Sequence, residues 1–519
     1  MHKTSKIRAF DPLWSRPLSQ CRGAPDKMLQ KNNIIAALRR DPARRQTFAL
    51  RAGDWHFDYA ALPLTAAQRS ALVARWTGSD HLDRVRALFA GEQVNESEQQ
   101  PALHMALRAT KPAGYADSVA VAEQRHRFLD LAERLHSGQQ GLTDLIHLGI
   151  GGSDLGPRLV ADAINDNDSA VKVHWCATVD GRRMRRLLAS LDPATTGLVI
   201  ASKSFTTEET LLQARAVKAW LGERFAAHTW EATASPARAL DFGINEAHLL
   251  TFPSWTGGRF SLWSAVGVSA AAAIGRTAFE ALLAGAEQAD QAMQAESEAD
   301  APQGLAVWMA LVLHHLRREM DYSTLSVVSY TPRLALLGDY LQQLVMESLG
   351  KGVDREGQPL SEPTSPLILG GRGTDLQHSI FQAIHQGPDN HPMLLVGCVD
   401  DESADPAWSR VQLAHLLGQA RALTYGRQDG TPHQRMPGHR PTMVLLAPRL
   451  TAHNLGYLLA SFEHAVFALA TLWRINPFDQ WGVEEGKRLA GRYRQMLEAR
   501  TGKADDGDLS TLLAWLDRY

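Results

Sequence analysis

The stretch DLIHLGIGGSDLG, residues 144–156, decides the fold class because the pattern of the chain changes there. Leu145–Leu148 form a short apolar run that indicates a buried strand, and the glycines after it indicate a tight turn into a helical stretch. The same alternation continues through apolar runs at residues 171–177 and 197–201. Strands that alternate with helices predict a parallel sheet flanked by helices, and therefore an α/β fold.

The rest of the chain extends this pattern in both directions. A second series of apolar runs lies at residues 325–330, 366–369, 393–399 and 443–446. Two α/β domains are the simplest account of the two series. Between them, residues 276–301 are rich in Ala, Glu and Gln, which predicts a helical connection rather than a flexible linker. Residues 27–108 carry Ala, Leu and charged residues at helical spacing, which predicts a helical N-terminal region.

Composition limits the classes of partner. A chain of 519 residues is long enough for two or more domains, and 45% hydrophobic with 21% charged residues describes an ordinary globular protein. The 54 Lys and Arg nearly balance the 56 Asp and Glu, so no general basic field attracts nucleic acid or an acidic membrane surface. We therefore expect neither partner, and an anionic ligand has to be attracted locally.

Cysteine usage and the terminal segment suggest a compartment. Cys21, Cys176 and Cys398 are too scattered for a zinc site and too few for a disulfide framework, so we expect free, mostly buried thiols. Residues 1–14 lack the apolar run of a secretory signal, and the apolar stretch 262–275 is too short to span a bilayer and predicts a buried helix. The cytoplasm is the expected location.

The glycine-rich turn at 149–156 has two interpretations. If Gly149 and Gly151 are the first two glycines of a dinucleotide fingerprint, the third position falls on Asp154, where close packing of helix and strand requires glycine. Asp180, after the next predicted strand, keeps an NAD-dependent dehydrogenase as an alternative. The other interpretation is a tight turn without a ligand.

The segment SKSFTT, residues 202–207, offers several hydroxyls and one ammonium just before a helical stretch. Backbone N–H groups at a helix start, together with Lys203, are suited to hold a phosphate. Ordinary capping is the alternative, because Thr206 and Glu209 have the spacing of a capping box. A Walker loop is absent from the sequence, so the phosphate need not belong to ATP.

Two further segments carry candidate catalytic groups. Gln343 and Glu347 are four residues apart in a helical pattern and therefore share one face, which becomes functional only if that face lines a cleft. In Gly257-Gly258-Arg259, a guanidinium stands beside two residues without Cβ, so backbone and ligand can approach closely. The alternative for both segments is a solvated surface.

His378 and the C-terminal segment complete the set. Thr374 and Gln377 have capping-box spacing, which places His378 in the first turns of a helix, where the dipole favours a neutral imidazole. A satisfied structural histidine is the alternative. The histidines show no metal-ligand spacing with Cys or Glu, so we expect no metal. Gln480 and Lys487 are seven residues apart and would line one face if helical.

Taken together, the motifs resemble the phosphoglucose isomerase family. The most specific motifs are SKSFTTEET (202–210), GGRFS (257–261) and FDQWGVEEGK (478–487). The resemblance implies two sugar isomerase (SIS) domains, each a parallel sheet flanked by helices, in an intertwined homodimer with active sites at the subunit interface. The corresponding division is an N-terminal helical region at 1–108, a small domain at 109–275, a large domain at 276–487 and a helical tail at 488–519.

The resemblance also implies a reaction, the interconversion of glucose 6-phosphate and fructose 6-phosphate in glycolysis and gluconeogenesis, without a cofactor. It assigns the phosphate to Ser202, Lys203, Ser204 and Thr207, and contacts with the sugar to Gly152, Ser153, Gly258, Gln343 and Gln480. Catalytic roles fall on Arg259, Glu347, His378 and Lys487. We expect Glu347 to be the base and Arg259 the stabiliser of an enediolate, and His378 and Lys487 to share ring opening. Glu209 is a candidate partner for the His378 imidazole.

Two positions depart from the family's usual pattern. Asp375-Leu376 stands where Asn-Gly usually precedes the Gln-His pair, and Leu349 stands where Asn is common. Both flank expected catalytic residues and bear on fine geometry more than on the class of reaction. A noncatalytic sugar-phosphate-binding regulator is a further alternative, but such a protein could dispense with Glu347 and Lys487, which this chain retains.

Overall fold

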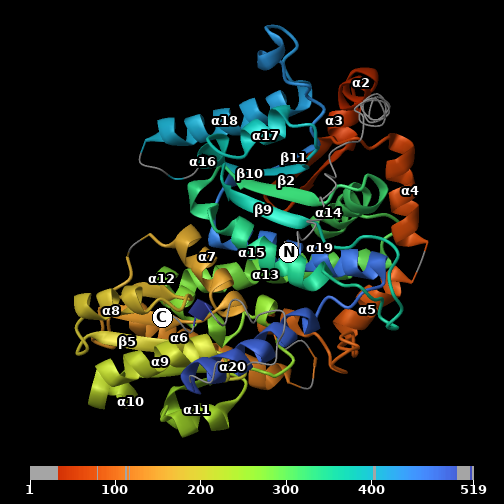
Figure 1. Cartoon of the computed structure of the whole chain (residues 1–519). Helices are drawn as coiled ribbons and strands as arrows, with labels where there is room; N and C mark the ends of the chain where they lie inside the picture. Colours follow the sequence, from red (N-terminus) through yellow and green to blue (C-terminus); the bar gives the residue numbers. More distant parts are fainter. Residues whose placement is uncertain are drawn as a thin grey trace, which may run out of the picture.

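The computed structural model describes residues 33–499 apart from 79, 112–113, 116, 167, 401 and 403–404, and it also describes residues 515–516. The expectations for residues 1–14, for Cys21 and for most of the tail beyond 499 fall outside these residues. Within them the chain forms two sheets with helices around and between them, as the two series of apolar runs predict (Figure 1). The domain boundaries proposed from the sequence remain predictions.

The smaller sheet has five parallel strands in the order β4-β3-β5-β6-β7. Its strands are β3 (Asp144–Leu148), β4 (Lys172–Cys176), β5 (Thr196–Ala201), β6 (Thr229–Thr233) and β7 (Leu249–Thr251). Side chains alternate between its faces, so Leu145 packs into one apolar cluster and Ile146 into another. The flanking helices are α6 (Ser118–His136), α7 (Leu155–Ile164), α12 (Val268–Ile274), α8 (Gly181–Ser190), α9 (Glu208–Leu221), α10 (Phe225–His228) and α11 (Pro236–Phe242).

The larger sheet has six strands in the order β1-β2-β11-β10-β8-β9. Its strands are β1 (Ala49–Ala52), β2 (Trp55–Ala61), β8 (Thr324–Ser329), β9 (Leu367–Arg372), β10 (Met393–Asp400) and β11 (Thr442–Arg449). The last four run parallel, and β2 joins β11 in antiparallel pairing. The hairpin β1–β2 was not expected in the N-terminal region. Its signal is the alternation of buried Trp55, Phe57 and Tyr59, which has the period of a strand.

Helices form the layer between and around the two sheets (Figure 1). They include α2 (Ile34–Arg40), α3 (Arg44–Thr47), α4 (Ala66–Thr77), α5 (His81–Ala90), α13 (Arg276–Ala295), α14 (Leu305–His314), α15 (Leu337–Leu349), α16 (Gly373–Gln377), α17 (Phe381–Gln386), α18 (Pro406–Tyr425), α19 (Ala452–Trp473) and α20 (Glu484–Ala499). α13 confirms the helical connection predicted for residues 276–301. Within the stretch 262–275, the α-helix is limited to α12, which is buried as expected.

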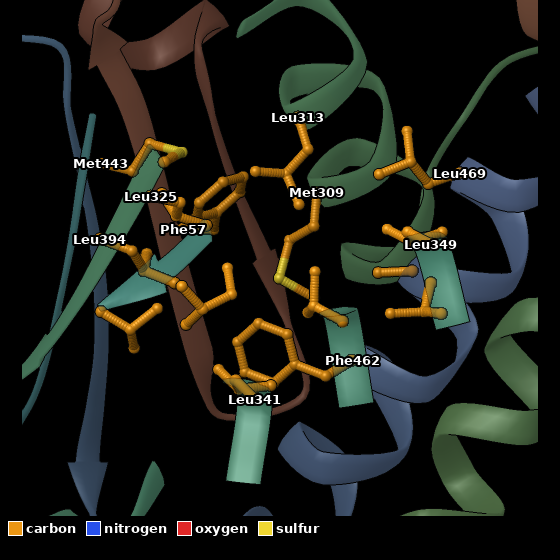
Figure 2. Close-up of a pocket in the computed structure, with 15 residues that line it drawn as sticks. Phe57, Met309, Leu313, Leu325, Leu341, Leu349, Leu394, Met443, Phe462 and Leu469 are labelled. Carbon is orange, nitrogen blue, oxygen red and sulfur yellow. The ribbon is translucent and has the colours of Figure 1, made fainter. Parts of the chain in front are cut away.

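α19 has the length and composition of a membrane-crossing helix, but the apolar window within it is entirely buried inside the fold. It packs against α13, α14 and α15. Figure 2 shows Phe462 and Leu469 of α19 facing Met309 of α14 and Phe57 of β2 across a small cavity. This cavity has a volume of about 30 Å³ and is lined only by apolar side chains, so it is a packing void of the core.

A charged cluster lies inside this helical layer. Arg108 is fully buried and forms ion pairs with Asp290 of α13 and Glu463 of α19. Trp263 Nε1 donates to Glu463 Oε1 at 2.8 Å, and His464 Nε2 lies 2.7 Å from Asp290 Oδ1. Burial raises the pKa of Glu463 to about 7 against the pull of Arg108. Burial also opposes ionisation of Asp290, but Arg108 outweighs it and holds the pKa at about 2.

Several strands of the two series were predicted at nearly their observed positions, but β6 and β7 were missed. β6 has the sequence TWEAT, whose polar residues obscure the strand, and β7 has only three residues. Glu231 of β6 is fully buried, and neither of its carboxyl oxygens has a hydrogen-bond partner among the residues that the structure describes. Burial therefore raises the pKa of Glu231 well above the ordinary value. Cys176 and Cys398 are buried, as expected, and neither forms a disulfide within the described part of the chain.

Glu231 predicts a pH dependence of stability. Because the pKa of Glu231 is higher in the folded state than in the unfolded chain, the folded state binds more protons above the unfolded pKa, and stability falls as pH rises. Glu231→Gln cannot ionise, so the gain in its free energy of unfolding over the wild type should be at least about 1 kcal/mol larger at pH 8 than at pH 5, the linkage energy of one pKa unit. Thermal and urea unfolding at the two pH values measure this difference; equal gains at both would show that Glu231 is stabilised by a partner.

Candidate active site

The candidate site is a cleft of about 900 Å³ at the carboxyl edge of the smaller sheet. β4 and β5 lie on opposite sides of β3, so the strand order reverses beside β3. Loops that follow neighbouring strands diverge at such a switch point and leave a crevice for a ligand. The loops after β3 and β5 both line the cleft, and α15 lines it from the other half of the molecule.

The loop after β3 is shaped by glycine. Gly151 has φ +57°, and a Cβ added to Gly152 would lie 2.0 Å from the carbonyl oxygen of Gly258. The two loops therefore touch backbone to backbone, which residues with larger side chains cannot allow. His147 stabilises the turn by a hydrogen-bond contact, with its Nε2 2.7 Å from the carbonyl oxygen of Ser153. Gly152, Ser153 and Gly258 all line the cleft, as expected.

The loop after β5 carries the predicted anion-binding groups. The cleft is lined by Ser202, Lys203, Ser204 and Thr207. Phe205 has φ +50°, a strained value for a residue with a side chain, and its ring is buried against Phe242 at a centroid distance of 5.4 Å. The buried ring thus anchors a loop conformation that turns the neighbouring polar groups toward the cleft.

The charge of Lys203 is only partly compensated. Burial lowers the pKa of the Lys203 ammonium, and Glu98 opposes this effect. Helix α9 begins directly after the loop, and the hydroxyl of its N-cap residue Thr207 makes no capping hydrogen bond. Its first N–H groups therefore lack the usual side-chain cap. A desolvated cation beside the start of a helix favours an anion such as a phosphate.

Arg259 stands at the opposite wall with its side chain only 1% exposed. Its Nε donates to Ser348 Oγ at 2.6 Å, and its Nη2 donates to the carbonyl oxygens of Pro477 and Asp479. Its Nη1 donates to Glu347 Oε2 at 3.3 Å and to Gln480 Oε1 at 2.9 Å. Burial lowers the pKa of Arg259, and Glu347 and Asp479 oppose this. The guanidinium is therefore held in one orientation beside a carboxylate.

Glu347 and Gln343 lie on one face of α15, as their spacing predicts, and this face lines the cleft. Gln343 Nε2 donates to Glu347 Oε1 at 3.3 Å. The Glu347 side chain is 30% exposed, so its carboxylate is accessible to a ligand, and the ion pair with the buried Arg259 restrains its position. This arrangement places a potential base next to a cation that can stabilise a developing oxyanion.

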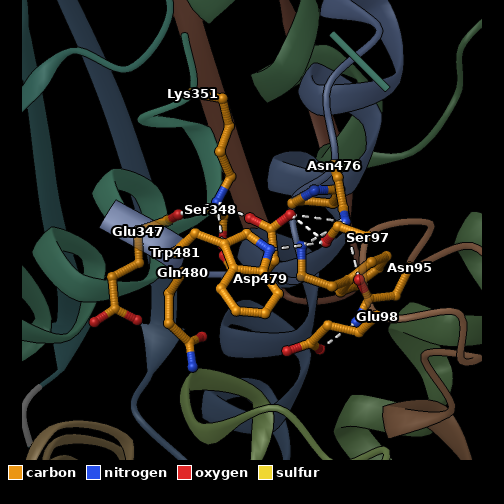
Figure 3. Close-up of polar contacts among 12 residues, drawn as sticks. Asn95, Ser97, Glu98, Glu347, Ser348, Lys351, Asn476, Asp479, Gln480 and Trp481 are labelled. Atoms are coloured by element: carbon orange, nitrogen blue, oxygen red, sulfur yellow. Dashed lines mark hydrogen bonds and ion pairs between the residues drawn. The ribbon is translucent and has the colours of Figure 1, made fainter. Parts of the chain in front are cut away.

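Around Asp479 lies a polar network that sequence analysis did not find. Figure 3 shows Lys351, Asp479, Ser97 and Asn476 joined by hydrogen bonds next to Glu347 and Gln480. These residues come from segments far apart in the chain. The available signal was Lys351 four residues after Glu347, just beyond the end of α15.

Gln480 and Lys487 both line the cleft, but not as one helix face. Gln480 lies before the short turn Trp481–Val483, and α20 starts only at Glu484. The Lys487 side chain is 66% exposed, and its Nζ donates to Glu484 Oε1 at 2.8 Å. Helix α20 is joined to the start of α9 by an ion pair of 2.6 Å between Arg494 and Glu208.

His378 lies away from the cleft within one chain. It is exposed and follows α16, at the end rather than in the first turns of a helix, so the argument from the N-terminal dipole is wrong. The reason is that α16 has only five residues and starts at Gly373, which leaves the Thr374 hydroxyl inside the helix. Glu209 lines the cleft and has no hydrogen bond to His378 among the described residues.

The alternative interpretations can now be compared with the geometry. The capping box of Thr206 and Glu209 does not form, because Thr207 is the N-cap of α9. Asp154 is buried against Arg158 at 2.8 Å, so the third position of the dinucleotide fingerprint holds an ion pair where glycine is required. Asp180 caps α8 by accepting from the backbone N–H of Arg182 and Arg183. Both findings argue against a dinucleotide site.

No group of three or more His, Cys, Asp or Glu within the described part of the chain is placed to hold a metal ion. The cleft offers an ammonium, several hydroxyls and the start of a helix on one wall, and a carboxylate with a buried guanidinium on the other. These features define the class of the protein as an enzyme that moves protons on a small phosphorylated substrate.

The chain belongs to the phosphoglucose isomerase family, whose model matches residues 58–512. Glucose-6-phosphate isomerase of Stenotrophomonas maltophilia (strain R551-3) is 42% identical over 505 residues, covering 94% of this chain and 97% of the relative. The enzyme of the same name from Xanthomonas euvesicatoria pv. vesicatoria (strain 85-10) is 41% identical over 480 residues, covering 91% and 93%. The crystal structure of a glucose-6-phosphate isomerase from Chlamydia trachomatis has a TM-score of 0.82 at 27% identity, covering 95% and 98%.

The contact between Gly152 and Gly258 leads to a prediction about the site. Gly152→Ala should separate the two loops, because the added Cβ would lie 2.0 Å from a backbone oxygen that cannot move freely. We expect a loss of about 1 to 3 kcal/mol in unfolding free energy, the usual effect of overpacking. Gly181→Ala is the matched control, since nothing lies within 4 Å of its Cβ. Thermal unfolding compares the two, and equal stability would show that the loops separate without strain.

Proposed function

We propose that this protein interconverts glucose 6-phosphate and fructose 6-phosphate. The observation that carries the proposal is the cleft itself, in which Glu347 and the buried Arg259 face a loop built to bind an anion. The family and the relatives named glucose-6-phosphate isomerase support the same substrate pair. The reaction is an aldose–ketose isomerisation and belongs to glycolysis and gluconeogenesis.

The phosphate end of the substrate is assigned to the loop after β5. An anion there would stabilise the charged form of Lys203, whose pKa is lowered by burial, and would accept hydrogen bonds from the loop hydroxyls and the first N–H groups of α9. The phosphate does not react. Its binding holds the sugar in register, so that contacts far from the reacting carbons assist the proton transfer.

The proton transfer is assigned to Glu347. In the open-chain aldose, its carboxylate takes the proton from C2 and leaves an enediolate with negative charge on O1, which Arg259 stabilises. Glu347 returns the proton to C1 while a hydroxyl proton passes from O2 to O1, and the ketose results. Gln343 and Gln480 hold Glu347 and Arg259 in position from the two sides. Each of these steps is a proton transfer, which requires no cofactor.

Ring opening requires a proton on the ring oxygen and the loss of one from the C1 hydroxyl. Lys487 lines the cleft and is one candidate. The other is His378 of the partner subunit in a homodimer with shared sites, and Glu209 at the cleft is its candidate hydrogen-bond partner. In support of a dimer, Leu367 and Leu369 are 56% and 43% exposed on β9, the edge strand that leads to His378. Exposed apolar side chains on a sheet edge favour coverage by a second chain.

We propose a cytoplasmic location, which Cys176 and Cys398 support because neither forms a disulfide among the described residues. A noncatalytic sugar-phosphate-binding regulator is the second candidate function. It would need only the loop after β5, whereas this chain also positions Glu347 and Arg259 with several hydrogen bonds. A carboxylate and a guanidinium held together in this way favour an enzyme over a noncatalytic regulator.

The purified protein should convert glucose 6-phosphate to fructose 6-phosphate without added metal or nucleotide, and excess EDTA should leave the rate unchanged. Glu347→Gln should bind substrate but lose turnover by roughly 10²-fold or more, the size of a general-base effect. Coupled assays measure the rate, and exchange of the C2 hydrogen with solvent measures the proposed step directly.

The matched control is Glu485→Gln on α20, because Glu485 is exposed and pairs only with Arg488 in the described chain. It should retain wild-type turnover. Exchange of the C2 hydrogen at the wild-type rate in Glu347→Gln would remove Glu347 from the role of base. Absence of fructose 6-phosphate with the wild-type protein would disprove the function itself.

The shared site is tested by mixing variants. Glu347→Gln and His378→Ala should each be nearly inactive as homodimers. Refolded together with random pairing, half of the dimers are mixed, and in each of these one site carries both defects and the other carries neither. Activity should therefore recover to roughly a quarter of the wild-type value. If the mixture stays inactive although size and mass measurements show mixed dimers, both residues belong to one subunit's site.

A further inference from the structure

The ammonium of Lys351 lies outside the cleft and has three hydrogen-bonding partners. It lies one helical turn after Glu347, just beyond the end of α15. Its Nζ donates to the carbonyl oxygen of Glu347 at 2.9 Å and to that of Asp479 at 2.6 Å, and it lies 2.8 Å from Asp479 Oδ1 (Figure 3). An ammonium has three N–H donors, so this geometry uses all of them. The ion pair is mostly buried, with side chains 13% and 10% exposed.

The second carboxylate oxygen of Asp479 is held by another part of the chain. Ser97 Oγ donates to Asp479 Oδ2 at 2.5 Å, and Asn476 Nδ2 donates to it at 3.0 Å. Asn476 Nδ2 also lies 2.9 Å from Asn95 Oδ1. Asp479 thus joins the N-terminal region, the end of α15 and the segment that follows α19. Neither Lys351 nor Asp479 lines the cleft, so any effect on catalysis has to pass through other residues.

The segment that this pair holds is the one that orients Arg259. The carbonyl oxygens of Pro477 and Asp479 accept from Arg259 Nη2, and Gln480 Oε1 accepts from Nη1 at 2.9 Å. The position of the guanidinium relative to Glu347 therefore depends on the position of residues 477–480. We infer that Lys351 and Asp479 are a positioning pair, which fixes the 477–480 segment and through it aims Arg259 and Gln480 at the reacting carbons.

A role in geometry explains why a charged pair is found here. Burial lowers the pKa of Lys351, and the hydrogen bond and charge of Asp479 oppose this. Removing two charges from water costs much of what their attraction returns, so a buried pair is a poor source of stability compared with apolar packing. The buried pair instead fixes the positions of the groups it joins, because each hydrogen bond is strong only within a narrow range of distances and angles.

The inference rests on the proposed function, and the experiment separates the two. Lys351→Met removes the charge and the three donors while keeping most of the side-chain length. We expect kcat to fall at least tenfold, since small displacements of catalytic groups have large effects on rate. Inhibition by inorganic phosphate should change less than threefold, because phosphate contacts the loop after β5 only. Inhibition by 6-phosphogluconate, whose carboxylate reaches the Arg259 end, should weaken.

Lys351→Arg retains a cation with several donors and should recover part of the lost kcat. Ser97→Ala removes the hydrogen bond to Asp479 together with those that Ser97 Oγ accepts from Asn476 and Trp481. Ser97 is exposed, so the protein should fold and show a smaller loss of kcat in the same direction. The matched control is Arg318→Met. The Arg318 side chain is 10% exposed and pairs with Glu362 at 2.9 Å outside the cleft, so its loss should affect stability and leave kcat unchanged.

The outcomes are distinguishable. If wild-type protein does not isomerise glucose 6-phosphate, the proposed function fails. If wild type is active and folded Lys351→Met and Ser97→Ala keep wild-type kcat, the positioning role is disproved. An equal loss of kcat and of phosphate inhibition would also overturn it, because such a loss indicates general disruption of the cleft. If Lys351→Met does not fold, kcat and phosphate inhibition are compared with the wild type in Lys351→Arg and Ser97→Ala instead. Wild-type kcat in both variants would then disprove the positioning role.

Discussion

The buried ion cluster around Arg108 is the interaction on which the arrangement of the molecule depends. It joins the N-terminal region to α13 and α19, the two helices that pack between the sheets. Removing one partner would leave an uncompensated charge in the core, which is far more damaging than the net value of the intact pair. The cluster also extends to the cleft through His104. The His104 ring lies 6.1 Å from the ring of His464 and stacks at 4.8 Å on Phe260, and both His104 and Phe260 line the cleft.

The cleft, like the ion cluster, depends on charged side chains that are buried away from water. The chain as a whole has a formal charge of −2, so it offers no long-range attraction for an anionic substrate. Instead, Lys203 and Arg259 are desolvated separately, one at each wall, and burial lowers the pKa of both. In a site with little water, such fixed charges act strongly on the ligand and need no reorganisation during the reaction.

Much of the fold could be predicted from the sequence, because its signals are local. Short apolar runs identified β3, β5, β8 and β11, and the spacing of Gln343 and Glu347 identified a shared helix face. The hairpin β1–β2 was missed although its alternation is visible, since the surrounding helical composition dominated the interpretation. Helix starts were also misjudged at Thr206 and Thr374, because capping depends on where backbone dihedral angles change and not on residue spacing alone.

The parts of the site that the sequence did not reveal are those assembled from distant segments. Lys351, Ser97 and Asp479 belong to three separate regions, and only the fold brings them together. The same holds for the contact of Gly152 with Gly258, which appears in the sequence as two ordinary glycine turns. His378 shows the converse, since its motif is clear in the sequence while the fold of one chain leaves it outside the cleft.

The cleft takes its two walls from different halves of the molecule, with the loop after β5 on one side and α15 on the other. In the proposed reaction the phosphate rests on the first wall and the reacting carbons meet Glu347 on the second. The packing of the helical layer, and not any single contact with the sugar, then sets the span between them. In the proposed reaction, this span would select substrates by the number of carbons between the phosphate and the carbonyl group.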